Sequence, residues 1–349
     1  MGGADQFYVR LVRALNGVGH HAVALNRPGS PIARALSADP LEQFHLPLAN
    51  QWDWLSAWRI RRWVKKRQPD IVQTYMGRAT RLTRLPPTGR AVHVARLGGY
   101  YKIAGYYTHA HAWVGNTRGV CDYLVRSGLP AERVYQIGNF VPDSPALDLA
   151  RLDDLRARLH LPEASCVIFT LGRFIDIKGF DDLLRAFAQL PIALRDRPLH
   201  LIIAGDGPLR DELHALARQL ELERRVHWAG WQSDPAPYYQ LADWVVCPSR
   251  HETLGNVILE AWSHGKPVLA TTTPGASELI RDGDNGLLTP CNDPAALARR
   301  LGEAITAPSV ESERLALAGR REVNEYHGRE AVVGAYLDLY ATLRRQRGH

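Results

Sequence analysis

Apolar positions along the chain alternate between short unbroken runs and longer stretches in which they recur every three or four residues. An unbroken run such as 166–171 is typical of a strand buried on both faces of a parallel sheet. The repeat in 209–220 is typical of an amphipathic helix. We therefore expect strands at 21–26, 70–74, 91–96, 112–115, 134–140, 166–171, 200–204, 226–231, 244–247 and 268–272. Helices are expected at 5–17, 52–68, 117–128, 152–159, 180–190, 209–220, 254–264 and 331–345, with one more short helix and strand within 34–46.

This alternation of strand and helix continues on both sides of a Pro- and Asp-rich stretch at 142–145, which is the expected linker. Such a pattern predicts the α/β class, with two doubly wound parallel sheets whose carboxyl ends face a ligand cleft. We place the first domain at 1–142 and the second at 148–325. The chain opens on Gly2-Gly3, the glycine turn of a βα phosphate-binding unit, without the strand that normally precedes it, so we expect the first sheet to lack a central strand.

Composition adds an uneven charge to this picture. The net charge is +7, and residues 1–145 carry 19 Lys and Arg against 8 Asp and Glu, while the remainder carries 24 against 28. A basic first half suggests an anionic substrate or surface, and nucleic acid and anionic lipid both qualify. The four scattered cysteines form no C-x-x-C pair, which indicates neither a zinc site nor a disulfide framework and fits a reducing cytoplasm.

The expected helix at 52–68 combines tryptophans with arginines and lysines. We interpret it as a helix that covers a sheet and leaves its basic face in water. The alternative is an interfacial helix that lies on anionic lipid, and weak adhesion to a membrane is compatible with either interpretation.

Candidate chemistry begins with two carboxylates, Glu252 and Glu260. We expect Thr253 to cap a helix that Gly265 and Pro267 end, which puts Glu252 at the helix mouth and Glu260 roughly 12 Å further along the axis. Carboxylates that far apart suit the two ends of one elongated ligand, with the free N–H groups of the helix start directed at an anion.

The stretch around these carboxylates, 248–268, resembles the Glu-x7-Glu signature of family 4 retaining nucleotide-sugar glycosyltransferases, which have the GT-B fold of two Rossmann-like domains. The loop Gly172-Arg173 to Lys178-Gly179 is similar to that family's Gly-Arg…Lys-Gly loop. Two cations there suit a departing nucleoside diphosphate, and without a convincing Asp-x-Asp motif we expect no metal and no cofactor. The resemblance also implies that a last helix, within 326–349, crosses back to the first domain.

The resemblance further implies roles for individual residues. Glu252, Arg173 and Lys178 would be catalytic, with Glu252 contacting sugar hydroxyls and Glu260 the ribose. Trp231 would either stack on the nucleobase or pack at the sheet edge. The residues expected to bind the donor are Gly2, Gly3, Gly172, Trp231, Leu254, Gly255, Asn256 and Glu260.

The acceptor side departs from the family pattern. Family members often carry a His-Gly pair after the strand that corresponds to 91–96, where this chain has Arg96-Leu97-Gly98-Gly99-Tyr100. Arg96, Gly98, Gly99 and Tyr100 are therefore candidates for an acceptor that bears phosphate or carboxylate. A structural turn with surface tyrosines explains the same residues equally well.

Taken together, the resemblance implies a cytoplasmic, metal-independent hexosyltransferase that acts with retention, in peripheral contact with the inner face of the membrane. Its donor would be a UDP-sugar, or else a GDP-sugar, and its acceptor a glycan or lipid-linked molecule of lipopolysaccharide or other cell-surface polysaccharide synthesis. A sugar-nucleotide epimerase on the same fold is the first alternative. A glycosidase leaves the Arg173 and Lys178 loop without a role. A nucleic-acid-binding protein lacks a recognised binding module, so we expect no nucleic-acid partner.

Overall fold

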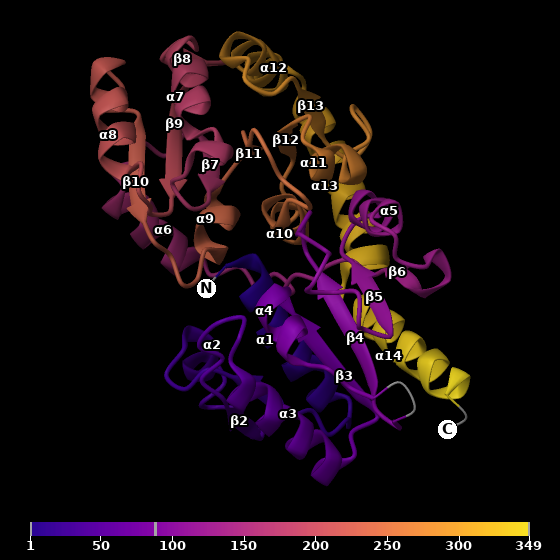
Figure 1. The fold of residues 1–349 in the computed structure, drawn as a ribbon. Helices are drawn as coiled ribbons and strands as arrows, with labels where there is room; N and C mark the ends of the chain where they lie inside the picture. Colours follow the sequence, from indigo (N-terminus) through magenta and orange to yellow (C-terminus); the bar gives the residue numbers. More distant parts are fainter. Residues whose placement is uncertain (1, 87–88, 348–349) are drawn as a thin grey trace. The chain divides into compact units, whose positions relative to one another are not determined.

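The computed structural model describes residues 2–86 and 89–347. Their contacts divide the chain into two compact units, one formed by Met1–Phe140 with Arg329–His349 and the other by Val141–Gly328. Figure 1 shows helices packed on parallel strands in each unit. The α/β class with parallel sheets is therefore confirmed.

Unit 1 contains two parallel sheets among its described residues. The smaller pairs β1 (Ala24–Asn26) with β2 (Gln43–His45), and the larger has the order β3-β4-β5-β6. The strands of the larger sheet are β3 (Ile71–Tyr75), β4 (Val92–Leu97), β5 (Ala112–Gly115) and β6 (Val134–Gln136). The helices are α1 (Gly3–Gly17), α2 (Pro31–Ala35), α3 (Trp54–Arg67), α4 (Met76–Leu82), α5 (Arg118–Arg126), the short η1 (Ala131–Arg133) and α14 (Arg329–Gln346).

The core of unit 1 joins the beginning of the chain to its last helix. Phe7 of α1, Val94 of β4 and Tyr336 of α14 belong to one cluster of buried side chains. Tyr340 of α14 also donates a hydrogen bond to Gln73 of β3, at 2.6 Å. Helix α14 therefore packs with a sheet that lies some 200 residues or more before it in the sequence.

Unit 2 contains a parallel sheet with the order β10-β9-β7-β11-β12-β13, and β8 pairs antiparallel with β9. Its strands are β7 (Cys166–Leu171), β8 (Ala193–Leu194), β9 (Arg197–Ala204), β10 (Val226–Gly230), β11 (Trp244–Cys247), β12 (Val268–Thr271) and β13 (Leu287–Thr289). Its α-helices are α6 (Leu149–Arg158), α7 (Phe180–Ala188), α8 (Arg210–Gln219), α9 (Ala236–Leu241), α10 (Asn256–Ser263), α11 (Pro274–Leu279), α12 (Pro294–Thr306) and α13 (Ser309–Glu322), with short helical turns η2 (Asp176–Lys178) and η3 (Val323–His327).

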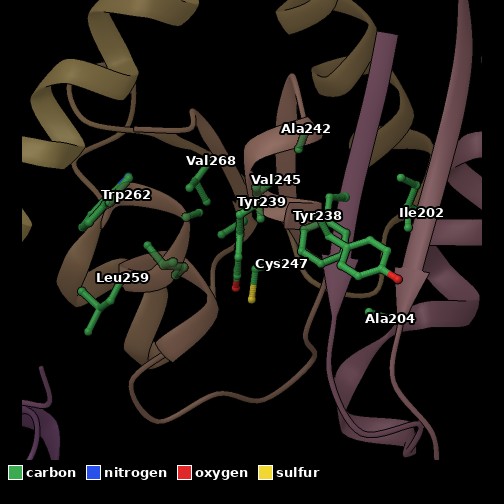
Figure 2. Close-up of a cluster of buried hydrophobic side chains, with 14 of the residues drawn as sticks. Ile202, Ala204, Tyr238, Tyr239, Ala242, Val245, Cys247, Leu259, Trp262 and Val268 are labelled. Carbon is green, nitrogen blue, oxygen red and sulfur yellow. The ribbon is translucent and has the colours of Figure 1, made fainter. Parts of the chain in front are cut away.

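Two clusters of buried side chains cover the two faces of this sheet. Figure 2 shows one of them, in which Tyr238 and Tyr239 of α9 and Trp262 of α10 lie with the strand residues Ile202 and Val245. Trp262 is fully buried and lies against Gly319 of α13, where an added Cβ would come within 2.2 Å of its indole. The strand order reverses between β7 and β11, which makes this pair of strands the topological switch point of the sheet.

Candidate active site

Two loops leave the carboxyl ends of the switch-point strands. The 172–179 loop follows β7, and the 248–255 loop follows β11. Ligands of doubly wound sheets bind outside the carboxyl ends of the strands at such a point. The topology therefore places a candidate site where these two loops meet.

The loops are joined by an ion pair between Lys178 and Glu252. About a fifth of each side chain is exposed, so both charges are mostly withdrawn from water. Burial tends to lower the pKa of Lys178, but the charge of Glu252, the nearby Cys247 and the hydrogen bond to Glu252 outweigh it and raise that pKa above its ordinary value. Lys178 is therefore a fixed cation at the switch point throughout the neutral range.

Arg173 lies at the start of the 172–179 loop. Its side chain is exposed and forms no ion pair with another described residue. The backbone beside it is tightly held, because an added Cβ at Gly205 would lie 1.9 Å from the carbonyl oxygen of Gly172. The Arg173 side chain therefore extends into solvent from a tightly packed backbone.

Backbone contacts also hold the two loops together. The N–H of Arg250 donates to the carbonyl of Ile177 at 2.9 Å. Gly179 has a φ of +62°, and an added Cβ there would lie 2.2 Å from the carbonyl oxygen of Pro248. A side chain at Gly179 is therefore excluded twice, by backbone conformation and by space.

Arg250 completes the connection, and the sequence reasoning did not identify it. Its guanidinium lies 2.7 Å from carboxylate oxygens of Asp176 and Asp181 and 2.9 Å from one of Asp182. Burial opposes the charge of Arg250, but these carboxylates raise its pKa further above the ordinary value. The signal in the sequence was an arginine two positions before Glu252 together with three aspartates around Lys178.

The start of α10 differs from the prediction. The helix begins at Asn256, and its N-cap is Gly255 with a φ of +85°, whereas Thr253 was expected to cap it. Glu252 therefore lies in the loop before the helix and not at its mouth. The loop at the start of α11 supports this segment, since the N–H of Gly275 donates to the carbonyl of Glu252 at 2.9 Å. The expectation that Glu252 and Glu260 lie along one helix axis is thus corrected.

Glu260 occupies a separate environment on α10. Its carboxylate accepts a hydrogen bond from the hydroxyl of Tyr239 at 3.0 Å. The Tyr239 ring stacks on His264, and the imidazole of His264 lies 2.8 Å from the Glu260 carbonyl. Leu254 and Gly255 are buried, and Asn256 is half-buried. The two carboxylates are consequently held by different partners, Lys178 for Glu252 and Tyr239 for Glu260.

Trp231 follows the last residue of β10, at the edge of the same sheet. More than half of its side chain, 57%, is exposed. Gly230, the residue before it, has a φ of +67° and accepts a hydrogen bond from the N–H of Gly205 at 2.8 Å. The exposure of the Trp231 side chain argues against a packing role at the sheet edge and leaves its indole accessible to a ligand.

The remaining candidates belong to unit 1. Gly2 caps α1, and its N–H donates to Asp5 at 3.0 Å, with Gly3 as the first helical residue. Gly98 is half-buried, Gly99 is buried, and Tyr100 is 38% exposed.

Arg96 is 2% exposed, so it is not a surface cation. Its guanidinium donates to Asn139 and to the hydroxyl of Tyr336, and it lies 3.9 Å from the centroid of the Phe7 ring. These contacts tie together α1, α14 and the segment after β6. Arg96 as an acceptor group stays a prediction, and this geometry favours a structural role instead.

Among residues 2–86 and 89–347, no group of three or more His, Cys, Asp and Glu side chains is placed to hold a metal ion. A cation at the switch point of a doubly wound sheet, with two separately held carboxylates nearby in the sequence, is typical of the class of α/β proteins that bind anionic nucleotide ligands.

The family follows from comparison with known proteins. A family model described as Glycosyltransferase Family 4 matches residues 1–144, and one described as Glycosyl transferases group 1 matches residues 153–322. The lipopolysaccharide core biosynthesis glycosyltransferase LpsE of Rhizobium meliloti (strain 1021) is 34% identical over 98% of this chain and 96% of its own length. The chain belongs to the family 4 glycosyltransferases.

Solved structures agree with this assignment at the level of the fold. A glycosyltransferase from Rickettsia africae matches with a TM-score of 0.84, at 20% identity over 97% of this chain and 94% of that one. Alr3699/HepE of Anabaena in complex with UDP and glucose matches with a TM-score of 0.82, at 19% identity over 98% and 96%. The protein is thus a glycosyltransferase with the GT-B fold.

Proposed function

We propose that this glycosyltransferase moves a hexose, with retention, from a UDP-sugar to a glycan or lipid-linked acceptor in lipopolysaccharide core synthesis. The similarity to LpsE over nearly the whole chain supports the pathway. The UDP bound by HepE, whose fold is similar, supports the nucleotide, with a GDP-sugar as the second choice.

The observation that carries the proposal is the ion pair of Lys178 with Glu252 at the switch point, with Arg173 on the same loop. As the glycosidic bond of the donor lengthens, negative charge grows on the leaving diphosphate. Lys178 supplies a compact ammonium and Arg173 a forked set of N–H groups to that charge. Because Lys178 is held by Glu252 before the reaction, this cation needs little reorganisation when the charge develops.

The carboxylates and Trp231 hold the other parts of the donor in this proposal. Glu252, oriented by Lys178, accepts hydrogen bonds from sugar hydroxyls, and Glu260, oriented by Tyr239, accepts them from the ribose. Trp231 stacks on the uracil ring, which its 57% exposure permits. Leu254, Gly255 and Asn256 present backbone N–H groups to the diphosphate.

We further propose that transfer needs no divalent metal, because two protein cations meet the two charges of the diphosphate. Retained turnover after prolonged treatment with EDTA supports this, and turnover that returns only when Mg²⁺ or Mn²⁺ is added back contradicts it. Gly2 and Gly3, at the start of α1, are further donor-binding residues in this proposal, and Tyr100 with Gly98 and Gly99 contacts the acceptor. The enzyme works in the cytoplasm, at the inner face of the membrane where a lipid-linked acceptor is found.

A donor panel tests the function directly. Purified full-length chain is heated with UDP-, GDP-, ADP- and CMP-sugars, and the melting temperature is read for each. A ligand at a hundred times its Kd stabilises the folded state by about 2.7 kcal/mol. At about 2–4 °C per kcal/mol for a domain of 150–250 residues, this raises Tm by about 5–10 °C. Only the true donor nucleotide should produce such a shift.

The sugar that binds is then incubated with core oligosaccharide acceptors, and the released nucleotide and the anomeric configuration of the product are measured. We expect UDP release that depends on acceptor, and a product with the anomeric configuration of the donor. Consumption of the nucleotide sugar without acceptor, to give a new nucleotide sugar, would identify an epimerase. If no nucleotide sugar shifts Tm and none is consumed, the proposal is wrong.

A further inference from the structure

Helix α3 of unit 1 presents aromatic side chains to solvent. Trp54 and Trp58 on the helix are 76% and 50% exposed, and Trp52, just before it, is 67% exposed. Leu55, between them, is 38% exposed. A group of large apolar side chains exposed together on one surface is typical of an interaction site.

The inner face of α3 accounts for only part of its hydrophobic residues. Ile60 is buried in a cluster with Leu46 and Leu82, and the Trp63 ring lies 5.8 Å from that of Phe44 in β2. At 100° per residue, positions 54, 55 and 58 lie on the face opposite Ile60. The expectation that the tryptophans of 52–68 serve to cover a sheet therefore holds for Trp63 but not for Trp52, Trp54 and Trp58.

The same outer face is basic, because Arg62, Lys65 and Lys66 also lie opposite Ile60 at 100° per residue. Helix α3 has no acidic residue. Its six cations are Arg59, Arg61, Arg62, Lys65, Lys66 and Arg67. Arg67 pairs with Glu42, while the other five form no ion pair with any residue of 2–86 or 89–347. The surface of α3 therefore carries several positive charges without an ion-pair partner, next to the exposed tryptophans.

We propose that the exposed face of α3, with Trp52, docks on an anionic lipid bilayer. Tryptophan prefers the boundary between headgroups and acyl chains, and lysine and arginine are attracted to anionic headgroups. A helix that carries both on one face lies in the plane of that boundary. The inference deepens the peripheral location of the proposed function and names the surface that makes the contact.

The geometry of the tryptophans favours a bilayer over a single-stranded nucleic acid. Nucleic-acid bases stack on open aromatic faces. The guanidinium of Arg81 lies 4.1 Å from the centroid of the Trp52 ring, and that of Arg62 lies 5.4 Å from that of Trp58. A cation over one face leaves Trp52 and Trp58 only one face each for a base, whereas insertion into a bilayer boundary requires only the apolar edge of the ring and the charges around it.

Binding to vesicles tests this face without any catalytic step. The full-length protein is sedimented with vesicles of phosphatidylcholine alone and with vesicles that contain about one-third phosphatidylglycerol, over a series of salt concentrations. We expect binding to the anionic vesicles only, weakening as salt increases. Brominated lipids should quench part of the tryptophan fluorescence in the bound state.

Three variants assign the contact. Arg62→Gln with Lys65→Gln and Lys66→Gln should weaken vesicle binding about 100-fold, since each cation near an anionic surface contributes a factor of about five. Trp52→Ser with Trp54→Ser and Trp58→Ser should remove the quenching by brominated lipid. The matched control has the same change in net charge on exposed arginines of unit 2, Arg218→Gln with Arg224→Gln and Arg299→Gln, and should bind nearly as the unchanged protein does. Circular dichroism confirms that each variant is folded.

The outcomes separate this inference from the proposed function. If the unchanged protein does not bind anionic vesicles, or if the control variant loses as much binding as the α3 variant, the inference is wrong. Binding to a single-stranded RNA that is as tight as binding to vesicles and is also lost in the tryptophan variant would assign the face to nucleic acid instead. UDP release with a water-soluble acceptor should be unchanged in the α3 variants, so failure of catalysis and failure of docking are read independently.

Discussion

Replacing Lys178 with alanine removes the cation on which the proposed chemistry depends. The side chain pairs with Glu252 and is about one-fifth exposed. Removing one group that stabilises charge in a transition state lowers kcat about 10²–10³-fold, which corresponds to about 2.7–4 kcal/mol of activation free energy. We expect a loss of this size in kcat, with a smaller change in KM.

The same substitution also affects folding, and the two effects can be separated. Loss of one partner costs about 3–5 kcal/mol for a fully buried ion pair and about 0–1 kcal/mol for an exposed one. Because about a fifth of each side chain reaches water, we expect a cost between these limits, on the order of 1–2 kcal/mol. That corresponds to a fall in Tm of about 2–8 °C for a domain of this size. At 25 °C the variant should remain folded while its turnover is nearly lost.

Steady-state kinetics with the donor identified by the thermal panel measures kcat and KM, and a thermal melt measures stability. Lys178→Met removes the charge and keeps the length, so it should be as slow as Lys178→Ala. Lys178→Arg keeps the charge and should recover part of kcat. Turnover of the alanine variant within about threefold of the unchanged enzyme would refute the leaving-group role of Lys178, because the mechanism asks for a loss of at least about 10².

The pH dependence gives an independent check on the same residue. Pairing raises the pKa of Lys178 above its ordinary value of 10.5. The contribution of the Lys178 charge to stability is therefore complete from neutral pH up to about pH 10.5 and is lost only as the pH rises through the higher pKa of the folded state. Between pH 7 and 9, the charge of Lys178 should not limit kcat, and a decline in kcat there must come from another group.

Three further substitutions follow from the geometry. Arg250→Leu leaves the carboxylates of Asp176, Asp181 and Asp182 without this partner and should lower kcat at least about tenfold with a smaller effect on KM. Arg250→Lys should partly restore kcat in steady-state kinetics, and a change confined to Tm would assign Arg250 a structural role only. Trp231→Ala should raise the donor KM about 5- to 150-fold, the range that loss of about 1–3 kcal/mol of base stacking gives, while Trp231→Phe stays close to the unchanged enzyme. Burial, together with two neighbouring histidines, lowers the pKa of His93 from 6.5 to about 3, so the unfolded chain takes up a proton that the folded chain does not, and stability should fall as the pH drops from about 6.5 towards 3. Urea unfolding at several pH values measures the free energy of unfolding, which should depend less on pH in His93→Gln than in the unchanged protein. An equal pH dependence in the two proteins would assign the acid sensitivity to other groups.

Much of the site could be predicted because parallel strands bring their carboxyl ends to one edge of a sheet. The runs before Gly172 and before Ser249 predicted two such strands, and the loops that follow them do meet, through Lys178 and Glu252. Which strands are neighbours is a matter of topology. The meeting of the two loops could therefore be predicted only from the fold that the family resemblance implies. The spacing of the residues along the chain does not establish this contact.

The details that escaped prediction depend on contacts between distant segments. The left-handed backbone at Gly255 displaced the start of α10 from Thr253, and a capping preference does not reveal such a backbone turn. Arg250 reaches aspartates that lie about 70 residues earlier, and Arg96 is buried through contacts with α14. Helices α12 and α13 were also missed, although Pro294 stands at the first turn of α12 and Asp293 caps it, both recognisable start signals.

The exposure of the α3 tryptophans was open to prediction in part. Positions 54, 58, 62 and 65 recur at helical spacing, so they share a face that also carries cations. The pattern leaves unresolved which face of an amphipathic helix turns inward when both faces carry tryptophan. Ile60 and Ser56 decide it in the structure, since both are buried.

The first unit is assembled from both ends of the chain, and this has a consequence for its biosynthesis. The buried cluster that holds Phe7 and Val94 also contains Tyr336, which leaves the ribosome after every residue of unit 2 has been made. Domains that are continuous in sequence can fold as soon as they emerge. Unit 1 lacks the side chains that α14 contributes to its core until unit 2 has been synthesised, so we expect unit 2 to reach its native state first.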